Sequence, residues 1–294
     1  MSLAGRAVLQ RYRADSADAA TRGLASAAVG TVLVQLRKPY VVQISDTHLF
    51  EDPAARLWGV APEHHADQVI DAVLAVAPEP ELVLVTGDCS ADGTVASYER
   101  LGKKVARLGA PACYLPGNHD DAALMAGMLM GRALDKEKLC FSVDVLGWRF
   151  IMLDSSVRGE DAGCIGDAQR EWLRNTLASA PGMPVVVAVH HNPLPVGSEW
   201  LDTMTISDGA ALLAILDTAP HVKAVLFGHV HQEFEEYRDG TLYASVPSTF
   251  FQFKPRSRDF GRDESRPPGA RLVRLSGGEV QSAVLRVGDP APKL

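Results

Sequence analysis

Short apolar segments recur along the chain, and polar residues follow each of them. A run such as Leu82-Val83-Leu84-Val85 is short for a helix and rich in β-branched residues, which favours a buried strand. The polar residues that follow predict where each strand ends. Five strands of this kind are predicted, over Tyr40–Ser45, Leu82–Val85, Ala112–Pro116, Pro184–Val189 and Val222–Phe227.

Between these strands the apolar residues are spaced as in amphipathic helices. Val69, Ile70 and Val73 show this spacing in the first such segment. Helices are predicted over Glu63–Ala77, Thr94–Leu108, Ala122–Leu134, Asp167–Leu177 (capped by Asp167) and Asp208–Asp217. Hairpins are predicted over 139–153, 233–245 and 270–287. The alternation of strands and helices predicts one α/β domain with mixed sheets.

The first 38 residues form an N-terminal extension ahead of the domain at 39–294. A loose helical spacing comes first, and Thr31–Leu36 alternates enough for an edge strand, so we expect a helix and a strand. The extension could dock on its own domain or pair across a homodimer. Leu24–Leu36 is too short and too broken to span a membrane, and no small-residue cleavage site follows it, so we expect neither export nor a membrane partner.

Charge and cysteine usage narrow the functional classes. The formal net charge is −7 and the pI about 5.7, which disfavours nucleic acid as a partner. The four cysteines lie far apart and contain no C-x-x-C pair, which indicates free thiols in a reducing compartment. A cytoplasmic protein is therefore expected.

Each predicted buried strand runs into residues that commonly bind metals. The carboxyl ends of strands are where an open α/β sheet places its ligands. Seven ligands are too many for one ion and fit two if Asp88 bridges them, because a carboxylate has two oxygens to share. Nitrogen and oxygen ligands without a thiolate suit Fe, Mn or Zn. The seven candidates are Asp46, His48, Asp88, Asn118, His190, His229 and His231.

Taken singly, these motifs have ordinary structural explanations. Asp46-Thr47-His48 could be a turn, and Asp88 could cap a helix. Their joint occurrence, one motif after each buried strand, favours a metal site. For other residues the sequence favours structural roles. His64, His65 and His221 are expected to be solvated or loop residues, and Cys89 and Trp172 to be packed. A solvated basic loop is expected to contain Arg256, Arg258, Arg262 and Arg266.

The order of the motifs resembles the calcineurin-like metallophosphoesterases. The motifs are Asp46-x-His48, Gly87-Asp88, Gly117-Asn118-His119-Asp120, His190 and Gly228-His229-Val230-His231. Further stretches, including Gln43–Phe50 and Pro247–Phe253, resemble the bacterial class III cyclic-nucleotide phosphodiesterases. The chain departs from the frequent His-His-Pro-Pro of the family by having Asn192 after His191.

The resemblance implies a fold and an assignment of ligands. The implied fold is a four-layer αββα sandwich of two mixed sheets. One metal would be held by Asp46, His48, Asp88 and His231, and the other by Asp88, Asn118, His190 and His229. Asn118, His119 and His191 are expected to contact the substrate, with Asp88, Asn118 and His119 taking part in catalysis. A hydroxide bridging the ions would attack phosphorus in line, while His119 assists the leaving oxygen.

These expectations lead to a dinuclear-metal phosphodiesterase with a small-molecule substrate. The first hypothesis is hydrolysis of a 3′,5′-cyclic nucleotide, with cAMP converted to AMP. The alternative is a broader phosphodiesterase acting on glycerophosphodiesters or 2′,3′-cyclic nucleotides. Aromatic loop residues that stack a base would favour the cyclic nucleotide over the other diesters. The candidates are Phe50, Trp58, Trp200 and Phe251. A metal-free scaffold on the same fold is disfavoured because every ligand position is filled.

Overall fold

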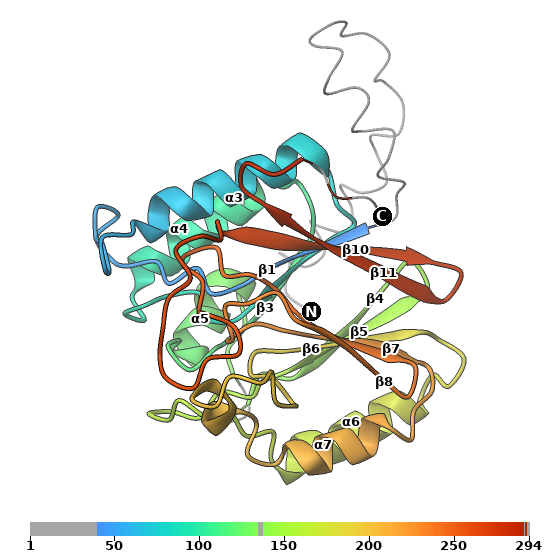
Figure 1. The fold of residues 1–294 in the computed structure, drawn as a ribbon. Coiled ribbons are helices and arrows are strands. Elements are labelled where there is room, and N and C mark those ends of the chain that lie inside the picture. The colour runs from blue at the N-terminus through green and yellow to red at the C-terminus, as the bar shows by residue number, and fades with distance from the viewer. Residues whose placement is uncertain (1–39, 135–137, 291, 293–294) are drawn as a thin grey trace, which may run out of the picture.

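Two β-sheets face each other through the middle of the molecule (Figure 1). A computed structural model describes residues 40–134, 138–290 and 292. The helix and the strand predicted within residues 1–38 lie outside the described residues, so they stay predictions.

The first sheet carries the earliest predicted strands. Its parallel core is β1 (Tyr40–Ile44), β2 (Leu82–Thr86) and β3 (Ala112–Leu115). The C-terminal hairpin of β10 (Gly269–Ser276) and β11 (Glu279–Arg286) extends it, with β10 antiparallel to β1. The strand order β11-β10-β1-β2-β3 therefore joins the two ends of the described chain in one mixed sheet.

The second sheet is mixed as well. The strands β5, β6, β7 and β9 are parallel, and β4 and β8 run antiparallel at its edges. In spatial order the strands are β4 (Phe141–Val145), β5 (Trp148–Leu153), β6 (Val185–Val189), β7 (Val222–Phe227), β9 (Thr241–Ser245) and β8 (Glu235–Arg238).

Helices cover the outer face of each sheet, which completes the expected four-layer αββα sandwich (Figure 1). Alternate side chains of a strand point to opposite faces. Leu82 and Leu84 accordingly pack between the sheets, whereas Val83 and Val85 pack against helices. The helices are α3 (Pro62–Val76), α4 (Val95–Ala106) and α5 (Ala122–Met130) on the first sheet and α6 (Asp167–Ala178) and α7 (Gly209–Leu216) on the second.

The structure corrects three local predictions. Helix α5 ends at Met130 rather than Leu134, because Gly131 adopts a left-handed φ of 60° and donates its N–H to Ala126. Asp167 does not cap α6: Gly166 precedes the helix, and Asp167 is its first residue and pairs with Arg170. The loop predicted after Pro193 contains a 3₁₀ turn, η1 (Leu201–Met204).

The loops at the carboxyl ends of the strands approach each other so closely that they require glycine. A Cβ on Gly117 would lie 2.1 Å from Asp88 Oδ1 and 2.4 Å from its backbone nitrogen. A Cβ on Gly228 would lie 2.1 Å from Ser45 Oγ. These distances are far inside van der Waals contact. Glycine at 117 lets two loops of the first sheet meet, and glycine at 228 lets a loop of the second sheet meet the end of β1.

We expect Gly117→Ala to lower the melting temperature of the protein, because the added methyl group overlaps the Asp88 loop. Overpacking of this kind costs about 1–3 kcal/mol. The matched control is Gly127→Ala in α5, where a Cβ meets nothing within 4 Å; it should be neutral or stabilise by up to about 1 kcal/mol. Thermal unfolding by circular dichroism measures both, and equal melting temperatures for the two variants would contradict the steric argument.

Candidate metal centre

The predicted ligand residues follow strands of both sheets and meet at one edge of the sandwich. Parallel pairing of β1 with β2, of β2 with β3 and of β6 with β7 brings the carboxyl ends of these strands together. Between the sheets, Gln43 Nε2 donates to Thr86 Oγ1 at 3.0 Å and to the Phe227 carbonyl at 3.1 Å. This bridge holds the ends of β1, β2 and β7 in register.

The backbone at this edge is strained. Side chains disfavour positive φ, and residues held there persist only where the surrounding structure fixes them. Half of the non-glycine residues with positive φ in the described chain are predicted ligands. They are Asp46 (56°), His48 (44°), Asp88 (47°), His229 (64°) and His231 (46°).

A first group of four side chains is tightly clustered and buried. The ligand atoms of Asp46, His48, Asp88 and His231 all lie within 4.8 Å of one another. His231 Nε2 lies 3.3 Å from Asp46 Oδ1, and His48 Nε2 lies 3.5 Å from Asp88 Oδ2. The two Nε2 atoms of His48 and His231 are 3.2 Å apart. These are the four residues expected to hold one ion.

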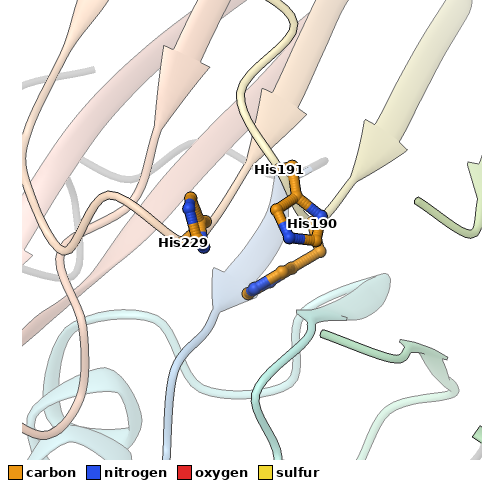
Figure 2. A group of neighbouring side chains, drawn as sticks. All are labelled: His190, His191 and His229. Atoms are coloured by element: carbon orange, nitrogen blue, oxygen red, sulfur yellow. The ribbon is translucent and has the colours of Figure 1, made fainter. Parts of the chain in front are cut away.

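A second group adjoins the first on the other side of Asp88. His190 Nε2 lies 3.5 Å from Asp88 Oδ1 and 3.2 Å from Asn118 Oδ1. His229 extends from the loop after β7 and faces the two histidines that follow β6 (Figure 2). Its Nε2 is buried and has no hydrogen-bond partner among the described residues, so this nitrogen is available as a ligand.

His191 lies next to these rings, but both of its ring nitrogens already contact other protein groups. His190, His191 and His229 have ligand atoms within 4.8 Å of one another. The Nδ1 atom of His191 is 2.7 Å from Ser155 Oγ, and its Nε2 is 3.2 Å from the Asp161 carbonyl. Because both nitrogens are engaged and the side chain is fully buried, this geometry offers neither the expected contact between His191 and substrate nor a free nitrogen for a metal.

Asp88 connects the two groups. Its Oδ2 faces His48 and its Oδ1 faces His190, which is the arrangement a bridging carboxylate needs. Oδ1 also accepts a hydrogen bond from the His119 backbone N–H at 3.0 Å. That bond fixes the carboxylate and links it to the loop carrying Asn118.

The charges of the site are coupled. Burial alone would raise the pKa of Asp88, but the neighbouring imidazoles, His190 first, hold it well below its usual value. Burial lowers the pKa of His48 to about 3 and, with His190, that of His229 to about 3. For His190 burial would lower the pKa, but Asp88 outweighs it and raises the pKa to about 9.

The arrangement calls for positive charge. Two carboxylates, Asp46 and Asp88, are buried, and the only ion-pair partners that the described residues give them are histidines. Buried charges are stable only when they are paired or bind metals. A metal ion would replace the proton on His190 and supply the missing partner of His229. The residues present therefore fit two metal ions that share Asp88.

Backbone carbonyls orient two of the rings. His190 Nδ1 lies 2.7 Å from the Thr86 carbonyl, and His231 Nδ1 lies 2.9 Å from the Phe251 carbonyl. A ring that donates from Nδ1 directs the lone pair of Nε2 into the site, as metal-binding histidines usually do. Both contacts join residues distant in sequence, so motif spacing gives no sign of them.

Asp120 has a supporting role that the sequence analysis missed. Its carboxylate accepts hydrogen bonds from the backbone N–H groups of Cys89 (3.0 Å), Ser90 (2.9 Å) and Gly117 (2.9 Å). It also accepts one from the Tyr98 hydroxyl at 3.1 Å. Asp120 thereby ties the Asp88 loop to the Asn118 loop. Asp120 stands in the Gly117-Asn118-His119-Asp120 motif, but the motif does not indicate which groups its carboxylate binds.

Next to the metal ligands lies a cavity of about 350 Å³. His119 is exposed and lines it together with Asn118, and its ring lies 4.9 Å from that of His48, centroid to centroid. The four aromatics proposed to stack a base also line the cavity. They are Phe50, Trp58, Trp200 and Phe251.

The residues assigned structural roles are placed as follows, with some differences from the expectation. Cys89 is buried as expected, and His64 is exposed. His65 is not simply solvated, because its Nδ1 contacts the Phe250 carbonyl at 2.7 Å. Arg262 belongs to the basic loop but places its guanidinium 5.5 Å from the Trp58 ring centre.

No helix within residues 40–134 and 138–290 combines the length and apolar character needed to cross a bilayer.

Two bacterial phosphodiesterases are similar to this chain in sequence over most of its length. The 3′,5′-cyclic adenosine monophosphate phosphodiesterase CpdA of Pseudomonas aeruginosa is 38% identical over 250 residues, covering 85% of this chain and 90% of that protein. A 3′,5′-cyclic-nucleotide phosphodiesterase of Nostoc is 37% identical over 235 residues, covering 80% and 87%.

Solved structures extend the likeness of fold. A dimetal phosphatase from Danio rerio superposes with a TM-score of 0.58 at 16% identity and covers 85% of this chain and 99% of its own. The sequence profile of the calcineurin-like phosphoesterases matches residues 39–233. With that match and the identity to the bacterial enzymes, the chain belongs to the calcineurin-like phosphoesterase family.

Proposed function

We propose that the protein is a metal-dependent phosphodiesterase that hydrolyses a 3′,5′-cyclic nucleotide, with cAMP converted to AMP. The observation that carries this proposal is the position of Asp88 between two buried histidine groups at the wall of a cavity. The relatives named for this activity share 34–38% of their residues with the chain. The position of Asp88 and the identity to these relatives both favour hydrolysis of a small phosphodiester.

The proposed ligands are those expected from the motifs. Asp46, His48, Asp88 and His231 would hold one ion, and Asp88, Asn118, His190 and His229 the other. Fe, Mn and Zn are the proposed metals, because the ligands are imidazole nitrogens and oxygens without thiolate. When bound, two such ions supply Lewis acidity toward the phosphate and a nucleophile at neutral pH.

The protein's own groups position the diester and assist the leaving oxygen. The Asn118 side chain lines the cavity beside the metal ligands, where its amide can orient a phosphate oxygen. His119 is held through its backbone N–H by Asp88 Oδ1. Its exposed ring is free to donate a proton or hydrogen bond to the departing ribose O3′.

The cellular setting remains a proposal. Cys89, Cys113 and Cys164 are free thiols, which suits a reducing compartment, and we propose the cytoplasm. The possible homodimer depends on residues 1–38, outside the described residues, so it stays a prediction.

The function is tested by kcat/KM of the Mn²⁺-loaded protein on 3′,5′-cAMP, 2′,3′-cAMP, glycerophosphocholine and bis-p-nitrophenyl phosphate. We expect 3′,5′-cAMP to be preferred and Asp88→Ala to be inactive on all four, because it removes the carboxylate facing both histidine groups. A preference for 2′,3′-cAMP or glycerophosphocholine would move the substrate to the broader class. Inactivity with Mn²⁺, Fe²⁺ and Zn²⁺ would reject the proposed phosphodiesterase activity.

Metal binding should also be visible without activity. We expect a chelator to lower the melting temperature and Mn²⁺ to restore it, because the ions compensate two buried carboxylates. At about 100 times the dissociation constant, ligand binding adds about 2.7 kcal/mol of stability. Asp88→Ala should lose most of this increment, measured by calorimetry. If neither the chelator nor the metal changed the melting temperature of the wild type, the proposed metal site would be contradicted.

The role of His119 predicts a dependence on the leaving group. His119→Ala should reduce kcat by about 10²–10⁴-fold on 3′,5′-cAMP, whose leaving alkoxide needs a proton. The loss should be much smaller on bis-p-nitrophenyl phosphate, whose leaving phenolate does not. His64→Ala, an exposed histidine of α3, is the control. Equal losses on both substrates would rule out proton donation by His119.

A further inference from the structure

The cavity beside the metal ligands has an apolar half. Its volume of about 350 Å³ is at the lower end of the range for small-molecule sites, about 300–1,000 Å³. Beyond the metal-site residues and His119, Asp161 is the only charged side chain that lines it among the residues that the structure describes. The apolar half is formed by Phe50, Leu57, Trp58, Trp200, Leu201, Met204, Phe251 and Phe253.

The rings in this half form a continuous wall from a metal ligand to the cavity mouth. The ring of Phe253 stacks on His231 with centroids 4.5 Å apart and planes at 26°. Phe251 follows, 5.1 Å from Phe253, and Trp58 stands edge-on to Phe251 at 5.0 Å. A phosphate at the metal ligands would therefore carry its substituent along these rings.

Apolar surface is exposed at Trp58, which lines the cavity, and at Phe260, which contacts Trp58 beside it. Trp58 is 49% exposed and Phe260 53%, and their ring centroids lie 5.6 Å apart. An exposed apolar patch next to a cavity marks a binding site more often than a packing fault. Trp58 in particular buries too little of its indole to be explained by the hydrophobic core.

The backbone under Trp58 is unusual. Leu57 and Val60 exchange both backbone hydrogen bonds at 3.0 Å, which makes Trp58-Gly59 the centre of a two-residue turn. Both central residues have positive φ, 51° and 81°, as in a type I′ turn. Asn, Asp or Gly is the usual residue in the first position, and a bulky side chain is strained there.

Arg262 supports the strained residue from outside. Its guanidinium carbon lies 5.5 Å from the centre of the indole, and its NH1 lies 3.4 Å from the Trp58 carbonyl. Strain of this kind persists where it serves a function. Here the turn holds a large flat ring at the mouth of a cavity that a smaller residue would leave open.

We propose that this aromatic wall, with Trp58 at its outer end, is the subsite that binds the nucleobase of the cyclic nucleotide. This inference rests on the proposed function, which supplies the base. Stacking on aromatic rings tolerates any base, and within the described part of the chain Asp161 is the one further charged group in the lining. The subsite therefore selects base-bearing cyclic phosphates over base-free diesters and distinguishes adenine from guanine only weakly.

The test compares 3′,5′-cAMP with its base-free analogue, 1-deoxyribose 3,5-cyclic phosphate, for the wild type and three variants. Trp58→Asn puts the residue that the turn favours in place of the indole. It should lower kcat/KM on cAMP about tenfold, mainly through KM, and leave the base-free substrate unchanged. Its melting temperature should equal or exceed that of the wild type, because strain is relieved.

Trp58→Phe should recover part of the loss, since a smaller ring still stacks. The matched control is Tyr237→Asn, which removes another exposed aromatic ring, 68% exposed on β8. It should leave both substrates unaffected. This pair separates the loss of a base contact from the general effect of deleting a surface ring.

Two outcomes would overturn the subsite while leaving the phosphodiesterase intact. One is a wild type that hydrolyses cAMP no better than the base-free analogue. The other is a Trp58→Asn variant that loses the same factor on both substrates or melts earlier, which would make Trp58 a structural residue. A wild type that hydrolyses neither cyclic phosphate would reject the proposed function together with the subsite.

Discussion

The burial of two carboxylates at the junction of two sheets is the constraint on which the rest of this structure depends. Asp46 and Asp88 have almost no exposed surface and no lysine or arginine partner within the described residues. Folding alone gives no reason to place such charges there, because desolvation is costly. A site for cations would explain this cost. The surrounding histidines, the strained backbone and the glycines would then serve to position the two carboxylates.

Hydrogen bonds from neighbouring residues hold the loops and rings of the site in place. Asp120 joins the Asp88 loop to the Asn118 loop through four accepted hydrogen bonds. Carbonyls of Thr86 and Phe251 orient His190 and His231. His191 fills the space behind His190 and His229 with both of its nitrogens bound.

Much of this could be predicted from sequence, and the limits have physical causes. The apolar runs before Asp46, Asp88 and Asn118 identified strands because buried parallel strands are continuously hydrophobic. The resemblance supplied the four-layer arrangement, which periodicity alone does not contain. Contacts between distant loops left no pattern, so the roles of Asp120 and the burial of His191 could not be foreseen. Boundaries also moved where a single backbone angle decided them, as at Gly131.

The origin of the ligands in both sheets has a consequence for how the protein matures. Asp46 and Asp88 leave strands of the first sheet, and His190 and His229 leave strands of the second. On the proposed ligand assignment neither sheet supplies a complete set, so high-affinity metal binding would require the two sheets to have docked. Bound ions would then act as a cross-link between the sheets that closes a long stretch of chain, and such cross-links add most to stability when the loop is long. Metal supply would thereby contribute to the folding of this protein as well as to its chemistry.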